Sequence, residues 1–343
     1  MPAPIHIVGH VCVDLTPALL GTYLGQPGEL VESGPLGVRT GGTVANCARV
    51  VAALGGDVQL GALVGNDALG DMCVALLESE HPGRVSLERT SAAATSYSVV
   101  VAPPGKDRTF WHHTGANDEF RGDIDVIPGA IMHFGYPTLC PGMCEGGGAP
   151  TIDLFTRARR AGGLTSLDLA YLADNSPLQS LDWHAYLHSV MAVTDIFCPS
   201  VDDLTSCLHM SGGGREVAEA LAAEFIEAGA AIVLITLGKD GSYLATGTAD
   251  RLAKLTGVCA ITPDQWANIS HYEPAAPIDA PEGAPLDTNG AGDTFKAAFL
   301  VALSRGFGPT EATHFASTTV ARRIAGQPLI PSADSALVNE EES

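Results

Sequence analysis

A glycine-rich turn near the C-terminus is the segment best suited to chemistry. It reads Asp287-Thr288-Asn289-Gly290-Ala291-Gly292-Asp293 and leads into an apolar run typical of a helix. The first N–H groups of a helix have no internal partner and the helix dipole adds partial positive charge, so Gly290, Ala291 and Gly292 are predicted to form an anion hole. Small residues there let a phosphoryl group approach the backbone closely.

Asp293, in the same turn, is a candidate general base. A carboxylate beside an anion hole can accept the proton of a substrate hydroxyl that lies in line with a phosphoryl group. Such general-base help contributes about 10²–10⁴-fold to a rate. The alternative is a glycine-rich helix start in which Asp293 only complements the helix dipole.

A second candidate site opens the first long helix. Gly41-Gly42-Thr43-Val44-Ala45-Asn46 places paired glycines at the helix entrance and Asn46 on its first turn. Asp14 ends the first predicted strand, so we expect it at the same carboxyl edge of the sheet, where open α/β folds bind ligands. Asp14 and Asn46 are suitable groups for binding the hydroxyls of a polyol. Glycines that serve packing alone are the alternative.

The elements that position these residues alternate between β-rich runs and helical patterns. This alternation predicts an α/β fold, with a mainly parallel sheet flanked by helices. The predicted strands are Ile5–Val13, Val58–Val64, Ala130–Gly135, Leu164–Asp168, Asp195–Cys198 and Ala231–Leu237. The predicted helices are Thr43–Leu54, with Thr43 as its cap, Ala68–Leu77, Ile152–Arg160, Glu216–Glu227, Ala291–Leu303 and Thr310–Ile324.

Two stretches interrupt the alternation. The segment 20–39 is rich in Gly and Pro, and the segment 95–113 is predicted to form a hairpin that turns at Pro103-Pro104-Gly105. We expect one domain over 1–343, with a small β lid formed by about 15–40 and 95–114. The segment 262–285 is predicted to be a loop or insertion.

Charge and composition exclude several classes of function. The net charge of −21 argues against nucleic acid and anionic membranes as partners. No apolar run reaches the length of about 18 residues that a membrane-spanning helix needs, and no secretory signal is recognised, so we expect a cytoplasmic protein. The eight cysteines show no zinc-like pairing and are interpreted as buried thiols.

These segments, in their order along the chain, resemble the signatures of the ribokinase (PfkB) family of sugar and nucleoside kinases. Asp287 to Asp293 is similar to the more specific, C-terminal signature. The other resembling segments are Gly41 to Asn46, Ala53-Leu54-Gly55, Gly65-Asn66-Asp67-Ala68-Leu69-Gly70, Thr236-Leu237-Gly238-Lys239-Asp240-Gly241, and Gly326 with Pro331.

The resemblance implies a ribokinase-like, Rossmann-type core with a β lid, ATP as phosphoryl donor and Mg²⁺ as cofactor. It assigns Asp293 as the base and the Gly290–Gly292 turn as the anion hole. The implied substrate contacts are Asp14, Gly41, Gly42 and Asn46. Tyr136 follows a strand and is a further candidate, because its ring could pack against a sugar or base. The implied nucleotide contacts are Thr236, Gly238, Lys239, Gly241, Ala316 and Thr319. The backbone around Asp287 is an implied site for a monovalent cation such as K⁺.

The sequence departs from the family pattern where Mg²⁺ is organised. The usual Asn-x-x-Glu is replaced by Ser200-Val201-Asp202-Asp203, in which Asp203 keeps a carboxylate that could hold Mg²⁺ through water. Cys12 stands near where ribokinase itself commonly has Asn, and Thr43 replaces a frequent Lys. We therefore expect a substrate other than simple ribose.

The sequence thus predicts ATP-dependent phosphorylation of a hydroxyl, expected to be a primary alcohol, on a small sugar or nucleoside. An apolar slot for a purine could come from Val99, Val101 and Phe110 of the lid. A sugar phosphate ranks third, because few of the 18 Lys and Arg residues lie near these motifs in the sequence. Lys239, Asp168, Arg108, His112 and His113 are further candidates, each with a surface, capping or strand position as the alternative.

Two other classes of function remain open at this stage. A non-catalytic sugar or nucleoside sensor on the same fold is possible because of the altered Ser200–Asp203 stretch. A dinucleotide-dependent oxidoreductase ranks far lower, since no G-x-G-x-x-G turn follows the first strand. The lid face could also pair two copies into a homodimer.

Overall fold

A nine-stranded sheet forms the centre of the molecule in the computed structural model, which describes residues 2–105, 108–281 and 286–330. Its strands run in the order β13-β12-β11-β10-β9-β8-β1-β4-β5. All neighbours pair in parallel except β11 with β12 and β12 with β13, which are antiparallel. The bounds are β1 Ile5–Gly9, β4 Val58–Gly65, β5 Val85–Thr90, β8 Ile131–Gly135, β9 Leu164–Leu167, β10 Ile196–Phe197, β11 Ile232–Thr236, β12 Ser242–Thr246 and β13 Ser270–Glu273.

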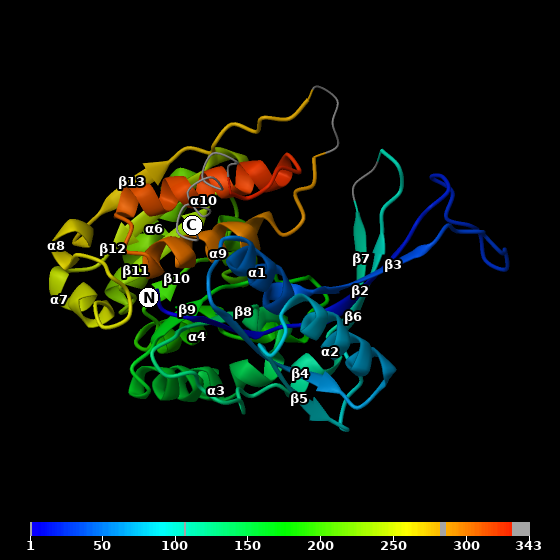
Figure 1. Cartoon of the computed structure of the whole chain (residues 1–343), viewed down its shortest axis with the longest axis horizontal. Coiled ribbons are helices and arrows are strands. Elements are labelled where there is room, and N and C mark those ends of the chain that lie inside the picture. The colour runs from blue at the N-terminus through cyan, green and yellow to red at the C-terminus, as the bar shows by residue number, and fades with distance from the viewer. Residues whose placement is uncertain (1, 106–107, 282–285, 331–343) are drawn as a thin grey trace, which may run out of the picture.

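Helices cover both faces of this sheet (Figure 1). Alternate residues of a buried strand point to opposite faces, so Ile232 and Leu234 of β11 belong to one apolar core and Val233 and Ile235 to the other. The first core is closed by α1 (Gly42–Ala53), α2 (Ala68–Glu80), α9 (Ala291–Ser304), α10 (Pro309–Ile324) and the short α7 (Ala249–Leu252) and α8 (Pro263–Trp266). The second is closed by α3 (Pro141–Arg160, interrupted at 145–148), α4 (Trp183–Met191), α5 (Val201–Cys207) and α6 (Arg215–Glu227).

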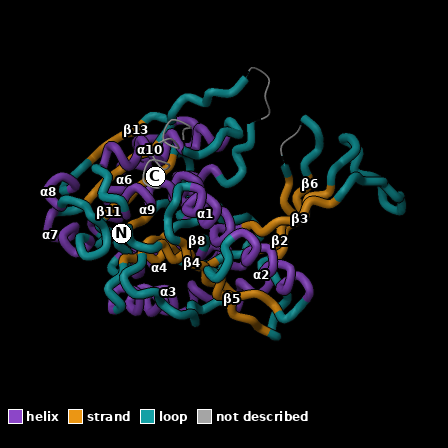
Figure 2. The backbone as a smooth tube through the Cα atoms, in the orientation of Figure 1, coloured by secondary structure: helices purple, strands orange, loops and turns teal. Residues whose placement is uncertain are grey.

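A second, four-stranded sheet projects from the body beside α1 and α2 (Figures 1 and 2). Its order is β3-β2-β6-β7, with β2 parallel to β6 and the other pairs antiparallel. The strands are β2 (Cys12–Pro17), β3 (Leu36–Gly41), β6 (Tyr97–Val101) and β7 (Thr109–His113). The predicted hairpin is therefore formed by β6 and β7, and the two interrupting stretches of the sequence build one sheet together.

The first predicted strand, Ile5–Val13, is wrong in its extent. The chain leaves the main sheet at Gly9, where φ is 117°, and begins β2 of the second sheet at Cys12. Both halves are apolar and buried, so periodicity alone could not reveal the bend. Thr43 is not the cap of its helix either: Gly41 is the N-cap, and the Thr43 hydroxyl contacts the Cys47 Sγ at 3.6 Å.

The segment 262–285 is not only a loop. It contains α8 and β13, the edge strand that pairs with β12. Residues 282–285 and Pro331 lie outside the described residues. Within the described ranges, no helix is both long and apolar enough to cross a membrane.

Candidate active site

Three side chains that the sequence places far apart meet at the carboxyl edge of the main sheet. Tyr136 follows β8, Asp168 follows β9, and Asp293 lies in the first turn of α9. Parallel strands end at the same edge, so residues that follow them converge there. Tyr136 has a left-handed backbone (φ 67°, ψ 53°), a strained conformation for a non-glycine residue and one that clusters at functional sites.

Asp293 is held on both of its carboxylate oxygens. The Asn46 Nδ2 donates to Oδ2 at 2.9 Å, and the Tyr136 hydroxyl donates to Oδ1 at 2.6 Å. Only 2% of Asp293 is exposed to solvent. Hydrogen bonds to an ionised carboxylate are strong and directional, so this carboxylate has a defined orientation. The structure therefore brings together three of the predicted site residues, Asn46, Tyr136 and Asp293.

The turn before Asp293 has the geometry of a helix N-terminus. Gly290 is the N-cap of α9 in the left-handed region (φ 70°), which favours glycine. The Ala291 N–H donates to the Thr288 carbonyl at 3.2 Å and closes the turn. Within the described ranges, the N–H groups of Gly292 and Asp293 have no hydrogen-bond acceptor, as expected of a first turn. The Ala291 N–H is therefore engaged within the turn, and anion binding by the predicted residues Gly290, Ala291 and Gly292 remains a prediction.

Lys296 is the site residue that sequence reasoning missed. It lies one turn after Asp293 on α9, is 3% exposed, and its Nζ lies 4.0 Å from Asp293 Oδ1. The same ammonium is hydrogen-bonded to Asp168 Oδ2 and lies 5.5 Å from the centre of the Tyr136 ring. A signal was present in the sequence, because Lys296 and Asp293 are the two charged residues of an otherwise mostly apolar helix, and a buried lysine needs a charged partner.

Burial and neighbouring charges shift the pKa values of the ionisable groups in this cluster. Burial alone would lower the pKa of Lys296, but the carboxylates of Asp168, Asp293 and Asp203 together raise it above its usual range. Burial raises the pKa of Asp168, with Lys296 opposing part of the rise, and burial also raises the pKa of Asp203. The site thus holds one ammonium among three carboxyl groups, an arrangement typical of functional sites.

The acidic groups of this cluster fit a hard cation. Asp168 Oδ1 is buried and has no hydrogen-bond partner among the described residues. Asp203 Oδ2 accepts the Ser200 N–H at 3.0 Å, in a capping box that starts α5. Carboxylate oxygens are the ligands Mg²⁺ prefers, and Mg²⁺ usually retains several waters. Asp168 and Asp203 therefore suit Mg²⁺ held through water.

The predicted substrate contacts Asp14, Gly41 and Gly42 lie together at the junction of the two sheets. Asp14 is buried on β2, 4.0 Å from the Arg39 Nε. A side chain at Gly41 would collide with the Asp14 carboxylate, and one at Gly42 (φ 81°) would collide with His10. Packing alone accounts for both glycines, so their contact with substrate remains a prediction.

The predicted nucleotide contacts divide into two groups. Thr236 ends β11, and Gly238 and Lys239 lie exposed in the turn that follows. Gly241 is packed so closely on the backbone of Glu273 and Ala275 that a side chain there would collide with it. Ala316 and Thr319 are buried on α10. Their roles toward a nucleotide remain predictions.

Asp287 is paired with the second sheet. The Arg108 Nη2 donates to Asp287 Oδ1 at 3.0 Å, and the Asn289 N–H donates to the same oxygen at 3.0 Å. Partial burial alone would raise the pKa of Asp287, but these two donors lower it. The ion pair links the hairpin of β6 and β7 to the turn that precedes α9.

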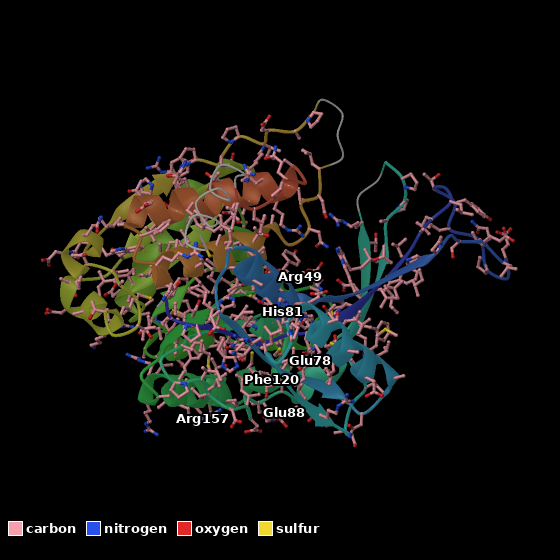
Figure 3. The ribbon with its side chains drawn as sticks, in the orientation of Figure 1. Arg49, Glu78, His81, Glu88, Phe120 and Arg157 are labelled. Atoms are coloured by element: carbon pink, nitrogen blue, oxygen red, sulfur yellow. The ribbon has the colours of Figure 1, made fainter. Side chains whose placement is uncertain are left out.

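A cavity of about 630 Å³ opens beside the Gly290 turn. Asn46 and Gly290 line it together with three arginines, Arg39, Arg49 and Arg323. Arg49, labelled in Figure 3, is held by Glu80, with 2.7 Å between its Nε and the carboxylate. Few cationic residues lie near the motifs in the sequence. The fold nevertheless brings three arginines, from β3, α1 and α10, to one cavity.

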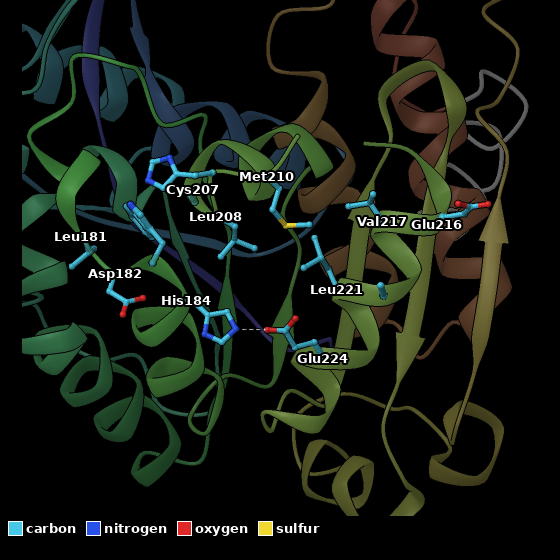
Figure 4. Close-up of a pocket in the computed structure, with 13 residues that line it drawn as sticks. Leu181, Asp182, His184, Cys207, Leu208, Met210, Glu216, Val217, Leu221 and Glu224 are labelled. Carbon is cyan, nitrogen blue, oxygen red and sulfur yellow. Dashed lines mark ion pairs between the residues drawn. The ribbon is translucent and has the colours of Figure 1, made fainter. Parts of the chain in front are cut away.

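A second cavity, of about 580 Å³, lies between α4 and α6 and contains none of the predicted site residues (Figure 4). Its lining is mostly apolar, with His184 and Glu224 paired at 2.9 Å across it. None of its lining residues belongs to the elements that carry Asp293 or the Gly290 turn, so we do not assign this cavity to the active site.

Comparison with known proteins identifies relatives of this chain. Relatives include a fructokinase of Klebsiella pneumoniae, 27% identical over 307 residues (89% of this chain, 85% of the relative). An ATP-dependent 6-phosphofructokinase of Thermoanaerobacterium thermosaccharolyticum is 24% identical over 278 residues (78% and 73%).

Solved ribokinase structures share the fold. The ribokinase of Thermotoga maritima matches with a TM-score of 0.67 and 22% identity, covering 98% of each chain. The ribokinase of Arabidopsis thaliana, complexed with ribose and ATP, matches with a TM-score of 0.68 and 21% identity, again covering 98% of each chain. The family model described as pfkB family carbohydrate kinase matches residues 3–327, so this chain belongs to the pfkB family of carbohydrate kinases and is a kinase.

Proposed function

We propose that this kinase transfers the terminal phosphoryl group of ATP to a hydroxyl, expected to be a primary alcohol, of a small sugar or nucleoside. The observation that carries the proposal is Asp293, a buried carboxylate fixed by Asn46 and Tyr136 at the N-terminus of α9. A base and an anion site in one turn are what in-line phosphoryl transfer requires.

In the proposed reaction the acceptor lies between the main sheet and the second sheet. Asp14 and Asn46 bind its hydroxyls, and Asp293 takes the proton of the reacting hydroxyl. The N–H groups of Gly292 and Asp293 stabilise the charge on the transferring group. The Lys296 ammonium, 4.0 Å from Asp293 Oδ1, balances the negative charge of the carboxylates.

ATP is the proposed donor, with Mg²⁺ as cofactor held through water by Asp203 and Asp168. When bound, Mg²⁺ neutralises charge on the donor phosphates. Thr236, Gly238, Lys239 and Gly241 border the proposed nucleotide site, with Ala316 and Thr319 behind it. We also propose that a monovalent cation binds near Asp287. Arg108 already supplies one positive charge there through its ion pair with Asp287.

The second sheet is proposed to act as a lid over the acceptor. It carries Asp14 and lies across from the turn of α9, to which Arg108 joins it. Closure of such a lid excludes water and protects ATP from wasteful hydrolysis. The lid and the core then form one kinase domain rather than two independent units.

Whether the acceptor is a neutral or a phosphorylated sugar depends on whether the three arginines of the cavity bind a phosphate group. A neutral sugar needs only the hydroxyl-binding Asp14 and Asn46. A phosphorylated sugar is the second candidate, because Arg39, Arg49 and Arg323 line the cavity that also exposes Gly290. Arginine binds phosphate through paired N–H groups, although Arg49 already binds Glu80.

The test is ADP release from ATP and Mg²⁺ across a panel of neutral sugars, nucleosides and sugar phosphates, with each reaction run in potassium and in a bulky organic cation. We expect ADP formation that depends on one acceptor class and yields a phosphorylated product by mass. A chain that is folded and binds ATP, yet forms no phosphorylated product with any acceptor, would contradict the proposed reaction.

Homodimer formation through the second sheet is also proposed. The long β2–β3 loop and the strands of this sheet expose large apolar side chains, among them Leu30 (95% exposed), Leu20 (73%) and Trp111 (63%). Soluble monomers rarely expose such apolar groups together, so a second copy is the simplest cover.

Light scattering is expected to give a mass of twice 35.4 kDa for the dimer. Leu30→Glu with Trp111→Glu should shift the protein to the monomer, whereas Met210→Glu, at an exposed apolar residue outside this sheet, should not. A wild-type protein that is monomeric at all concentrations refutes this assembly.

A further inference from the structure

Three soft ligand groups meet at the junction of the two sheets. His10 lies at the bend between β1 and β2, Cys12 begins β2, and His112 lies on β7. One ligand atom from each, an imidazole nitrogen or the thiol sulfur, lies within 4.8 Å of both others. His10 and Cys12 are buried, while His112 is exposed and leaves the cluster open to solvent.

Strand register creates this cluster. Asp14 pairs with Ser98 across β2 and β6, and Ser98 pairs with His112 across β6 and β7. Cys12 lies two residues before Asp14 and therefore points to the same face of β2. The bend at Gly9 then turns His10 back toward this face, because the chain leaves the main sheet there.

The spacing of the two imidazoles suits a tetrahedral ion. The Nε2 atoms of His10 and His112 are 3.2 Å apart. Two nitrogens on one zinc ion are expected about 3.3 Å apart, given Zn–N bonds of about 2.0–2.1 Å. The other nitrogen of His112, Nδ1, lies 3.0 Å from the Ser98 Oγ, the kind of outer contact that orients a ligating imidazole.

We propose that His10, Cys12 and His112 bind Zn²⁺, with the fourth position open to water. Imidazole nitrogens and a thiolate are the ligands of Zn²⁺ and exclude Mg²⁺, which prefers oxygen. On binding, the Cys12 thiol loses its proton to solvent and its sulfur bonds to the metal.

The consequence for catalysis rests on the proposed function. The Cys12 Sγ lies 3.4 Å from Asp14 Oδ1, the predicted acceptor contact, and the His10 ring lies 5.9 Å from the Tyr136 ring. An ion at this position would fasten β7 to the core and take the space of the acceptor hydroxyls. Zn²⁺ should therefore inhibit the kinase in competition with the acceptor, and not with ATP.

The experiment first removes a second candidate metal cluster found among the described residues. His184, His188 and Glu224 also place their ligand atoms within 4.8 Å of one another, on the exposed faces of α4 and α6. In the 343-residue chain carrying His184→Ala and His188→Ala, we expect one Zn²⁺ per chain, measured by competition with a chromophoric chelator. Co²⁺, used as a spectroscopic probe, should show a thiolate-to-metal charge-transfer band.

Adding Cys12→Ser to this background should remove the band and weaken Zn²⁺ binding at least about 10-fold. Loss of a group that orients a metal ligand already weakens metal binding by about 10-fold or more, and loss of the ligand itself should cost at least as much. Ser98→Ala should weaken binding less and keep the band. Thermal unfolding without metal checks that each variant is folded, and Cys12→Ala repeats the test if the serine variant is not.

Two results would overturn the proposal. One is loss of all Zn²⁺ binding in the His184→Ala, His188→Ala background, which would place the metal on α4 and α6. The other is equal affinity with and without Cys12, which would show that the Cys12 thiolate is not a ligand of the metal. Zn²⁺ binding is measured without substrate, so its outcome is independent of whether the proposed kinase reaction is found.

Discussion

Asp293→Asn is expected to retain affinity for the acceptor and to lose most turnover. The asparagine has the same shape and can remain in contact with Asn46 and Tyr136, but it cannot accept a proton from the substrate hydroxyl. General-base help is worth about 10²–10⁴-fold, so kcat should fall by that factor. The measurement is ADP release with the acceptor found in the panel, together with acceptor binding by calorimetry.

The matched control is Asp182→Asn. Asp182 is also an aspartate at the start of a helix, where it accepts the Ala185 N–H at 2.9 Å, but it lies at α4, far along the chain from the active-site elements. Asparagine is an equally good N-cap, so turnover should be unchanged. If Asp293→Asn keeps more than about a tenth of the wild-type rate, general-base catalysis of the expected size is excluded.

Lys296→Met is expected to have the largest effect on stability. Methionine fills a similar volume but leaves Asp168, Asp203 and Asp293 buried without their shared ammonium. Breaking a buried ion pair by removing one partner costs about 3–5 kcal/mol. The free energy of unfolding, measured by denaturant titration, should fall by that amount, and kcat should fall with it because the charge next to Asp293 is lost.

Two further variants separate charge from packing. Lys254→Met, at an exposed lysine, should change the free energy of unfolding by less than about 0.5 kcal/mol. Adding Asp168→Asn to Lys296→Met should recover part of the stability, because it removes one of the unpaired carboxylates. If the double variant is no more stable than Lys296→Met alone, the loss comes from packing and the electrostatic interpretation is wrong.

The fold class could be predicted from the sequence because its signals are local. Alternating apolar runs and helical patterns predicted the mainly parallel sheet and the helices at Ala68, Glu216 and Ala291 to within a few residues. The β12 and β13 strands of the antiparallel edge were not predicted. The chain 262–285, rich in Pro and Ala, gives no clear period, so its strand depends on pairing with β12.

The glycine-rich turn, the aspartate in it and the order of the motifs can be recognised locally, since a helix N-terminus with free N–H groups is a property of a few consecutive residues. The surroundings of Asp293 depend instead on long-range packing. Asn46 lies 247 residues before Asp293 and Tyr136 157 before it. Tyr136 reaches the carboxylate at the end of the parallel strand β8, whereas α1 brings Asn46 there from the junction of the two sheets. The three arginines of the cavity also come from separate elements. The same holds for the His10, Cys12 and His112 cluster, which depends on strand register and on the bend at Gly9. No local pattern in the sequence encodes these long-range features.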